Sequence, residues 1–479
     1  MDGDEQSDRR RGEAGSGPWT GARPWSGGSG RRTGPGAGPA DALPWRPFAR
    51  TARLASLPLG FAGRSVAKTG RRLLGEPGAA LNEEFQRRAA EQLFTVLGGL
   101  KGGAMKVGQL LSVFEAALPP SAVAPYRAAL TRLQEAAPPL AAEPMRGVLA
   151  AELGADWPEL FAEFDEAPVA AASIGQVHRA RWRDGRAVAV KIQYPNAREA
   201  LLGDYERIGS AIRVLSLPYR GLDIGPMVAE LKSGVAEELD YRLEAAAQQA
   251  FAEAYRDDPD IHVPAVVAHT GRVLVTEWLP GRPLAEVIAQ GTAAERDSAG
   301  LLLARFLLSG PERARMLHAD PHPGNFRLLP DGRLGVLDFG AVKRLPDGLP
   351  NTLGSLQRLA EDGEFAAAEE LLRQSGFLRR GVVAGPELVA AFLGPLAEPL
   401  RGPEFRFDRA WLREELARTA GPGARGLVRK LNLPPEYLLI NRAVTAGCAV
   451  LCQLDCVVPF RAEALRWLPG FAGPAAGGR

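Results

Sequence analysis

Cysteine is scarce in this chain of 479 residues, which contains only three, all of them late in the sequence. This scarcity argues against the disulfide framework of small secreted proteins and fits a reducing cytosol. A strong excess of charge is also lacking, because the formal net charge is +2 and 24% of the residues are charged. The sequence therefore indicates no strongly basic surface for nucleic acid, while its length suffices for two or three domains with a large core.

Long hydrophobic runs are missing as well. The first fifty residues contain no apolar run, so we expect no signal peptide, and Arg9-Arg10-Arg11 lacks the hydrophobic stretch that a twin-arginine signal needs. The most apolar segment, Tyr437–Phe460, is interrupted by residues that are costly in lipid, namely Asn441, Arg442, Gln453 and Asp455. We expect this segment to be a buried helix of a soluble, cytoplasmic protein without a transmembrane helix.

Composition divides the first 139 residues into two stretches. Residues 1–50 are rich in Gly, Pro, Ser and Arg and show no hydrophobic periodicity, which predicts a disordered tail. The stretch 51–139 contains an apolar stripe in steps of four and three residues, the pattern of an amphipathic helix. Its members are Leu93, Leu97, Leu100, Ala104, Val107, Leu111 and Phe114. Because Leu118-Pro119-Pro120 ends this helix, we expect 51–139 to form a helical extension.

Strand signals begin at about residue 166, after a short helix and a loop. Asp184-Gly185 stands between two runs of alternating character, which predicts a hairpin. The expected elements are, in order, the helix Glu143–Leu153, the strands Val177–Trp182 and Arg186–Ile192, a helical segment of about 196–256 and the strand Val273–Trp278. After residue 282 the pattern is mainly helical. A strand pair, a helix, a strand and then helices is the order of a two-lobe kinase.

One window carries most of the chemistry. It reads His318-Ala-Asp-Pro-His-Pro-Gly-Asn325, and Asp338-Phe-Gly follows it. Asp320 stands five residues before Asn325, and this spacing, with a second carboxylate in Asp-Phe-Gly, is typical of kinase-type phosphoryl transfer. Carboxylate and amide oxygens are suitable ligands for Mg²⁺ on nucleotide phosphates. We therefore expect Asn325 and Asp338 to bind Mg²⁺ with ATP, and Asp320 to be the catalytic carboxylate.

The stretch between these two motifs predicts a second hairpin. Short apolar runs, Phe326–Leu329 and Leu334–Leu337, flank Pro330-Asp331-Gly332, a signal for a tight turn. Such a hairpin would bring Asn325, just before its first strand, close to Asp338, just after its second. The alternative is that these three polar residues lie in unrelated loops. The occurrence of both motifs at the expected spacing, with a strand pair between them, disfavours this alternative.

A lysine at the end of a predicted strand is expected to contact the nucleotide phosphates. Lys191 follows Val-Ala-Val and would direct a point charge at the nucleotide phosphates. Such a lysine needs a carboxylate on a nearby helix, and Glu237, Asp240 and Glu244 are candidates. Asp240 and Glu244 are four residues apart on one helical face, and Glu237 lies a turn further back, so the spacing leaves the choice open.

The loop before the first hairpin lacks the glycines of an ordinary phosphate-binding lid. Its residues are Ala170, Ala171, Ala172 and Ser173. Alanine reaches positive φ less readily than glycine, so we expect a stiffer lid that approaches the phosphates less closely. Further on, Glu277-Trp278-Leu279 lies where an inter-lobe hinge belongs, and we expect the backbone of Glu277 and Leu279 to meet the adenine edge.

Five motifs occur in a fixed order along the chain. They are Lys106-Val-Gly-Gln109, Ala170-Ala-Ala-Ser-Ile-Gly-Gln-Val-His178, Val188-Ala-Val-Lys191, Glu238-Leu-Asp-Tyr241 and His318-Ala-Asp-Pro-His-Pro-Gly-Asn325. From about residue 85 to at least 345, the chain resembles the UbiB (AarF-like) family of atypical kinases. The resemblance implies an α+β, two-lobe protein-kinase-like fold with an N-terminal helical extension that carries the Lys-x-Gly-Gln motif. The expected domains are the tail 1–50, the extension 51–139, an N-lobe 140–281 and a mainly helical C-lobe 282–479.

The resemblance also implies roles that spacing does not assign. Lys106 and Gln109 are expected over the active site, near Glu238 and Asp240, and Glu244 is expected to be the partner of Lys191. Because Lys106 and Gln109 are three residues apart, both project from one face of a helix. An exposed helix edge is the plainer alternative for that pair.

Membership would imply binding of ATP with Mg²⁺ and support of isoprenoid-quinone biosynthesis or other lipid metabolism. UbiB proteins are more similar to ATPases or small-molecule kinases than to protein kinases, because the extension blocks a peptide groove. The alternative is a nucleotide-binding, pseudokinase-like scaffold that regulates a lipid or quinone enzyme, and an aminoglycoside-type phosphotransferase is a third hypothesis. Bacterial members often carry C-terminal membrane helices. Since this chain shows none, the remaining hypothesis is association with a membrane surface or a quinone precursor.

Histidines and cysteines raise the question of a second metal site. Cys448, Cys452 and Cys456 recur at every fourth residue and would form a band along a helix, but no histidine follows His322 to complete a site. Buried structural cysteines are the favoured interpretation. His318 and His322 bracket the aspartate of the motif window, where a histidine is more often structural than a zinc ligand.

Overall fold

The structure is a computed structural model that describes residues 140–172, 174–198, 239–379, 381–420, 430–432 and 434–473. The chain divides into two units, Met1–Trp45 and Arg46–Arg479, and every described residue belongs to the second. The expected tail and helical extension lie outside the described residues, as do Lys106, Gln109, Ser173 and Glu238. The domain boundaries inferred from the sequence therefore stay predictions.

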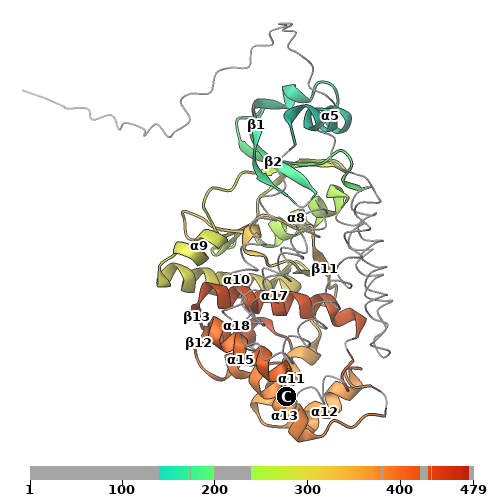
Figure 1. The fold of residues 1–479 in the computed structure, drawn as a ribbon, viewed down its shortest axis with the longest axis vertical. Helices are drawn as coiled ribbons and strands as arrows, with labels where there is room; N and C mark the ends of the chain where they lie inside the picture. The colour runs from blue at the N-terminus through green and yellow to red at the C-terminus, as the bar shows by residue number, and fades with distance from the viewer. Residues whose placement is uncertain are drawn as a thin grey trace, which may run out of the picture. The chain divides into compact units, whose positions relative to one another are not determined.

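The first sheet of the described fold is five-stranded and antiparallel (Figure 1). In the order β1-β2-β3-β6-β5, its strands span Phe161–Ala171, Gly175–Trp182, Ala187–Gln193, Val273–Glu277 and Val266–His269. Strands β2 and β3 form the expected hairpin, and Gly185 takes a φ of 91° in its turn, which glycine adopts without strain. Helix α5, Ala142–Leu153, packs its buried face against this sheet.

Strand β1 begins earlier than the sequence pattern indicates. The pattern predicts a loop up to about residue 166, whereas β1 starts at Phe161. An aromatic cluster is the physical reason: Phe161 and Phe164 pack edge-on with Trp157 and Trp182, and their ring centroids lie 5.1 to 6.1 Å apart. These contacts extend the strand through acidic residues that have little intrinsic preference for it.

Helix α8, Tyr241–Ala254, contacts strands β5 and β6 of the sheet. Its N-cap is Asp240, whose carboxylate accepts a backbone amide of the first turn. Buried residues of α8 join β6 in one hydrophobic cluster. The expected helical segment of about 196–256 is thus confirmed for α8, and 199–238 lie outside the described residues.

Two small sheets carry the motif loops. Strands β4, β10, β9 and β7 form one sheet in this order, and β11 pairs with β8 in the other. They span Ile261–His262, Leu334–Val336, Phe326–Leu328, Arg282–Pro283, Val342–Arg344 and Met316–His318, respectively. Strands β9 and β10 are the expected hairpin. Strand β4 comes from the range expected to form the N-lobe, yet it pairs in parallel with β10.

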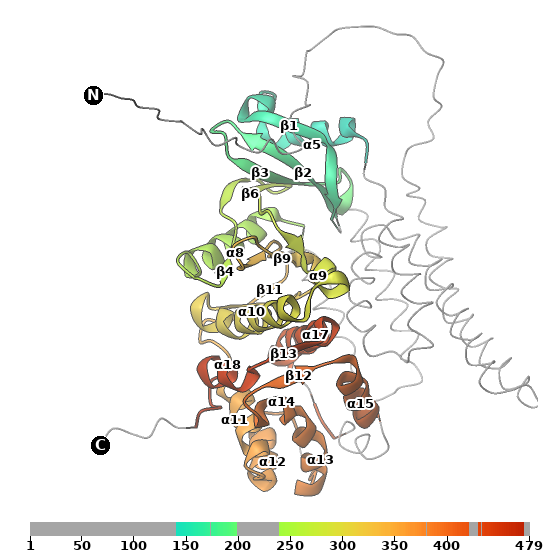
Figure 2. The ribbon, with the colours of Figure 1, turned by 90° about the vertical axis from the view of Figure 1, so that its left-hand side faces the viewer.

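Helices make up most of the remaining fold, as expected after residue 282. Helices α9 to α15, α17 and α18 span Leu284–Gln290, Ala293–Arg313, Asn351–Glu361, Phe365–Gln374, Pro386–Leu396, Glu398–Arg401, Arg409–Ala420, Leu438–Leu454 and Phe460–Trp467. Helices α10 and α17 lie side by side in both ribbon views (Figures 1 and 2). The largest hydrophobic cluster joins α8, α9, α10 and α17 to strands β9 and β10, so the motif hairpin rests on this core.

The apolar segment Tyr437–Phe460 is not one continuous helix. Helix α17 ends at Leu454, and Asp455 takes the left-handed conformation with a φ of 51°. Strand β13, Cys456–Val458, then pairs with β12, Phe405–Phe407. The expectation of a helical band of three cysteines is therefore wrong for the third, because the backbone leaves the helix one residue before it.

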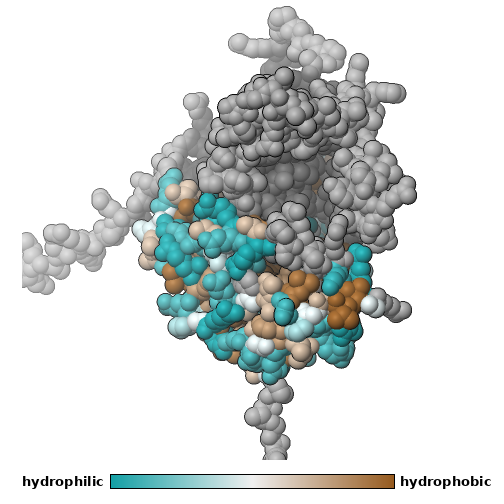
Figure 3. All heavy atoms as spheres, turned by 60° about the horizontal axis from the view of Figure 1, so that its bottom comes forward, coloured by the Kyte–Doolittle hydropathy of each residue, from teal (hydrophilic) through white to brown (hydrophobic). Residues whose placement is uncertain are grey.

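One helical stretch among the described residues, Pro435–Leu454, is long and apolar enough to cross a membrane. More than half of it, 56% of the window, is buried inside the fold, as in a core helix, and length and composition alone are weak evidence for a membrane span. Exposed large apolar side chains of the described residues stand on separate elements, namely Val169, Leu243, Val383, Val444 and Leu465. Figure 3 likewise shows hydrophobic residues interspersed with hydrophilic ones on one face.

Candidate phosphoryl-transfer site

The motif window forms the connection between strands β8 and β9. Asp320 follows β8, and a short 3-10 helix, Pro323–Asn325, leads into β9. The side-chain amide of Asn325 donates to the backbone carbonyl of Asp320 at 2.9 Å, and the backbone carbonyl of Asn325 accepts the amide of Leu337 at 2.8 Å. The hairpin therefore brings Asn325 beside the residue that precedes Asp338, as its turn signal predicts.

Lys191, Glu244 and Asp338 meet in an ion-paired triad. The Nζ of Lys191 in β3 lies 2.7 and 3.0 Å from the two carboxylate oxygens of Glu244 in α8, and 2.9 Å from Oδ2 of Asp338. Of the three carboxylates that helical spacing left open, the structure pairs Glu244 with the lysine. Asp240 caps α8 instead, and Glu237 lies outside the described residues.

Opposite charges keep Lys191 ionised. Burial disfavours the ammonium of Lys191, but the carboxylates of Asp338 and Glu244 outweigh this effect and raise the pKa of Lys191 well above its usual value. Glu244 is 5% exposed and Asp338 is 35% exposed, so the triad is closed on the helix side and accessible on the loop side. A positive charge is therefore available at neutral pH beside an accessible carboxylate.

A buried histidine holds the Asp338 loop in place. His318 donates from Nε2 to the backbone carbonyl of Asp338 at 2.7 Å. Its ring lies among Phe306, Phe326 and Phe339, with centroids 5.6 to 5.7 Å away. Burial lowers the pKa of His318, and the hydrogen bond to the carbonyl only partly offsets that effect. The residue is a neutral structural donor, in agreement with the sequence interpretation.

The carboxylate of Asp320 faces a residue from a distant helix. One guanidinium nitrogen of Arg442 in α17 lies 3.8 Å from Oδ1 of Asp320. Sequence reasoning missed Arg442 as a site residue and treated it only as a charge that is costly in lipid. A charged side chain within an otherwise apolar helix was the available signal, because such a residue needs a partner.

The segment after β6 has the position of a hinge. Glu277 is the last residue of β6, and Leu279 lies between this strand and β7 of the second sheet. The backbone amides of Glu277 and Trp278 donate to the carbonyls of Ala265 and Ala187 at 2.9 and 3.0 Å. Within the described part of the chain, no backbone carbonyl accepts a hydrogen bond from the amide of Leu279.

The alanine lid is a tight connection between β1 and β2. Ala170 and Ala171 end β1 and pair with the first residues of β2. The amide of Ala172 donates to the carbonyl of Gly175 at 2.8 Å, and Ser173 lies outside the described residues. This connection stands one strand away from Lys191, where a phosphate-covering loop belongs.

Comparisons with known proteins decide the family. A model of the ABC1 atypical kinase-like domain matches residues 132–358. A solved structure, "The complex structure of Rv3197-erythromycin from Mycobacterium tuberculosis", is 45% identical, and the match covers 83% of this chain and 100% of that chain with a TM-score of 0.65. The chain belongs to the ABC1 atypical kinase-like family. The UbiB resemblance and the kinase-like α+β fold are thereby confirmed.

Curated members of the ABC1 family are more distant in sequence. The chain is 34% identical over 332 residues to "Atypical kinase COQ8B, mitochondrial" of Rattus norvegicus, covering 66% of this chain and 61% of that protein. It is 29% identical over 351 residues to "Atypical kinase coq-8, mitochondrial" of Caenorhabditis elegans, covering 71% of this chain and 46% of that protein. The chain thus spans about half the length of the curated relatives it matches. Since those relatives are mitochondrial, the expected cytoplasmic location stays a prediction.

The surroundings of the three cysteines of this ABC1-family chain disfavour the thiolate form. Burial raises the pKa of Cys448 to about 11 and that of Cys456 to about 12, and it raises the pKa of Cys452 as well. Protonated thiols are poor metal ligands and poor nucleophiles. Within the described ranges, no three His, Cys, Asp or Glu side chains could hold a metal ion together. Cys452 and Cys456 are buried, as the sequence interpretation expects, whereas Cys448 is partly exposed.

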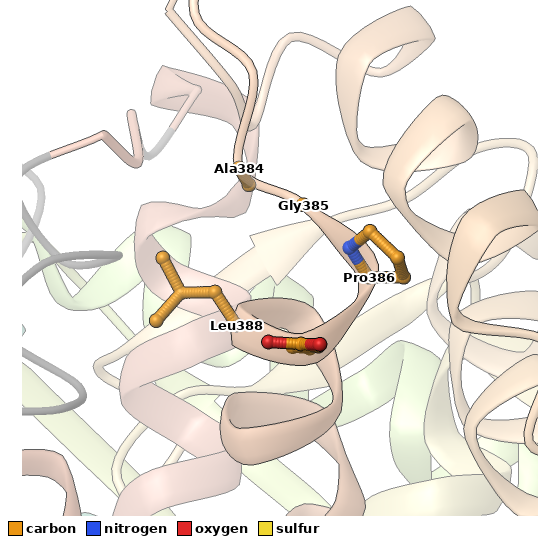
Figure 4. A pocket seen from close by; sticks show the side chains of 5 residues that line it. Ala384, Gly385, Pro386 and Leu388 are labelled. Carbon is orange, nitrogen blue, oxygen red and sulfur yellow. The ribbon is translucent and has the colours of Figure 1, made fainter.

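A separate hollow lies at the start of α13, away from the ABC1 motifs (Figure 4). Its volume is about 370 Å³, and it is lined by Ala384, Gly385, Pro386, Glu387 and Leu388. The buried carboxylate of Glu369 accepts two backbone amides of this loop at 2.8 and 3.1 Å and fixes its shape. None of the lining residues belongs to a phosphoryl-transfer motif, so this hollow is not the candidate site.

Proposed function

We propose that this chain binds ATP with Mg²⁺ and catalyses phosphoryl transfer or ATP hydrolysis as an ABC1-type atypical kinase. The observation that carries the proposal is the triad of Lys191, Glu244 and Asp338, which come from three segments far apart in the sequence. Burying a carboxylate and a lysine costs desolvation free energy, so such a pair is rare unless it serves a function. Unrelated surface charges do not assemble in this way.

Each residue of the site has a distinct part in this proposal. Asn325 and Asp338 would hold Mg²⁺, because amide and carboxylate oxygens are the hard ligands this ion prefers. Their surroundings fit: the nitrogen of the Asn325 amide is fixed on a backbone carbonyl, which leaves its oxygen for a cation, and Asp338 is accessible. When bound, the ion neutralises charge on the nucleotide phosphates. Lys191 binds those phosphates, Glu244 fixes the lysine, and Asp320 accepts the proton of the attacking hydroxyl or water.

The nucleotide is proposed to lie between the hinge and the lid. The amide of Leu279 and the carbonyl of Glu277 would meet the adenine edge. The lid, formed by Ala170, Ala171, Ala172 and Ser173, would cover the phosphates without the close backbone approach of a glycine-rich loop.

The family resemblance supports a further proposal about the acceptor. Lys106 and Gln109 would lie across the cleft near Glu238 and Asp240, and this arrangement would admit a small molecule, a lipid-like acceptor or water rather than a peptide. The proposed setting is isoprenoid-quinone or other lipid metabolism, with contact to a membrane surface or a quinone precursor. The scaffold alternative keeps nucleotide binding but has no turnover.

Turnover of radiolabelled ATP tests the proposal directly. We expect Mg²⁺-dependent release of phosphate or a labelled product from the purified chain, measured with and without lipid vesicles and quinone-precursor phenols. The Asp338→Asn variant should lose this turnover. Nucleotide binding without turnover under every condition would favour the scaffold, and undiminished turnover by Asp338→Asn would refute the assigned site.

A second candidate function is macrolide binding. The observation that favours it is the solved relative from Mycobacterium tuberculosis, which is a complex with erythromycin and is 45% identical, with the whole of that chain covered. A thermal-shift titration with erythromycin, with and without nucleotide, tests this candidate. A midpoint that does not change at saturating drug would exclude it.

A further inference from the structure

Arg442 stands beside the carboxylate that is proposed to be catalytic. The gap of 3.8 Å between its guanidinium nitrogen and Oδ1 of Asp320 is too long for a hydrogen bond, so the ion pair is loose. Among the described residues, this is the one ion-pair partner of either side chain. The side chain of Arg442 is 34% exposed and that of Asp320 is 21% exposed, so both are accessible to a ligand.

Packing fixes the position of Arg442 relative to the motif loop. Its neighbours on α17, Ile440 and Ala443, share a buried cluster with Leu317 of strand β8. Strand β8 ends at His318, two residues before Asp320. The same contact therefore anchors both members of the ion pair, although Arg442 lies beyond residues 132–358, which the family model matches.

The excess of negative charge at the site indicates a role for Arg442. Lys191 already contacts the carboxylates of Glu244 and Asp338, and Asp320 adds a third negative charge. A nucleotide triphosphate brings several more negative charges, and its terminal phosphate must approach Asp320 for transfer. Among the described residues, Arg442 is the cation that pairs with Asp320 at that side. Its planar guanidinium can bind two phosphate oxygens at once, which an ammonium cannot.

We propose that Arg442 binds the γ-phosphate of the nucleotide on the side facing the acceptor and stabilises the phosphoryl group during transfer. This inference rests on the proposed function. When the nucleotide binds, Arg442 turns from Asp320 to a γ-phosphate oxygen, which frees Asp320 to accept a proton. The acceptor oxygen then forms a bond to the γ-phosphorus as its proton passes to Asp320. The bond from that phosphorus to the bridging oxygen breaks, and its electron pair stays on ADP.

The test compares nucleotides with and without the γ-phosphate. Affinities of the full chain for Mg²⁺-AMP-PNP and Mg²⁺-ADP are measured by calorimetry, together with ATP turnover. For Arg442→Gln we expect the preference for AMP-PNP over ADP to fall about 10-fold, the ADP affinity to stay within about 3-fold, and turnover to fall about 100-fold or more. Arg442→Lys should be intermediate, because it keeps the charge but loses the fork. Arg466→Gln, which changes an arginine that packs on Trp467, is the matched control and should behave as wild type.

The outcomes separate this inference from the proposed function. An unchanged preference in Arg442→Gln, with wild-type turnover intact, would overturn the role of Arg442 and leave the function standing. Nucleotide binding by the wild type without turnover would refute the proposed catalysis, while the affinity ratio would still decide the role of Arg442. Absence of nucleotide binding by the wild type would overturn both. If Arg442→Gln does not fold, Arg442→Lys decides by the same ratio.

Discussion

Lys191 holds two carboxylates that come from different parts of the chain, and no other side chain of the site, within its described residues, is so constrained. Its ammonium balances the buried charge of Glu244 and keeps Asp338 at the accessible edge of the triad. Removing one member of such a group leaves the charge of another uncompensated in a poorly hydrated place. Substituting one residue of the triad should therefore affect both the stability of the fold and the proposed activity.

The first residue-scale prediction concerns Glu244. Glu244→Gln should lower the free energy of unfolding by about 1 to 3 kcal/mol, because Lys191 keeps Asp338 but loses its buried partner. ATP turnover should fall at the same time, since the lysine is no longer fixed. Urea unfolding measures the first effect. Glu286→Gln on α9 is the matched control: Glu286 pairs with Arg282 at the surface, so its loss should cost less than about 0.5 kcal/mol. Equal losses in the two variants would contradict the account.

The second residue-scale prediction concerns pH. Burial lowers the pKa of His178 and of His318 below the usual value of 6.5. Above that value both are neutral in the folded and the unfolded chain, and the stability is fully present. Below it, the unfolded chain binds protons that the folded chain resists, so stability should fall from about pH 7 to about pH 5. The thermal midpoint measured against pH checks this, and His178→Gln should make the fall shallower. A midpoint that rises over this range would disprove it.

Local spacing was sufficient to predict most of the candidate site but not all of it. Asp320, Asn325 and Asp338 share one window, so a hairpin turn between them fixes their proximity from the sequence. Glu244 was one of three candidates, because helical spacing alone does not say which turn of a predicted helix meets the strand that carries Lys191. Arg442 had no local signal for its partner, since only the packing of α17 on β8 brings it to Asp320.

At the scale of elements, strands β2 and β3 approach closely where the lid ends. A side chain at Gly175 would collide with the backbone carbonyl of Ile192 in β3. The glycine therefore lets the lid connection sit directly against the strand that carries Lys191. By contrast, nothing lies within 4 Å of a side chain added at Gly147 in α5.

These two glycines give an element-scale prediction. Gly175→Ala should lower the free energy of unfolding by about 1 to 3 kcal/mol and weaken nucleotide binding, because β2 must move away from β3. Gly147→Ala should instead stabilise the chain by up to about 1 kcal/mol, as alanine favours a helix. Thermal unfolding and calorimetry on both variants make the comparison. A stabilising Gly175→Ala would show that the lid does not pack as described.

Element boundaries were predictable where local signals dominate. Turn residues placed both hairpins correctly, because Asp184-Gly185 and Asp331-Gly332 determine the backbone locally. The start of β1 was missed because the contact of Phe161 with Trp182 comes from a residue distant in the sequence. The end of α17 was missed for a related reason: pairing of β13 with β12 overrides the apolar pattern that continues past Leu454.

At the scale of the whole molecule, the site joins two sheets that the sequence had assigned to separate lobes. Lys191 belongs to the five-stranded sheet, whereas Asp338 follows β10 of the four-stranded sheet. A nucleotide bound with its metal ion would contact both and should stabilise the fold by mass action. The pairing of β4 with β10 also joins a segment of the expected N-lobe range to the four-stranded sheet. The account thus depends on one metal-bound nucleotide bridging these elements.

Metal-dependent nucleotide binding at Asp338 tests that central claim most directly. Electron paramagnetic resonance with Mn²⁺ in place of Mg²⁺ measures the bound ion in the presence of AMP-PNP. We predict that the wild type binds Mn²⁺ with the nucleotide and that Asp338→Asn weakens this binding by at least about 10-fold. Asp362→Asn, a surface substitution next to α11, should leave it unchanged. Equal Mn²⁺ affinity in the wild type and in Asp338→Asn would contradict the account.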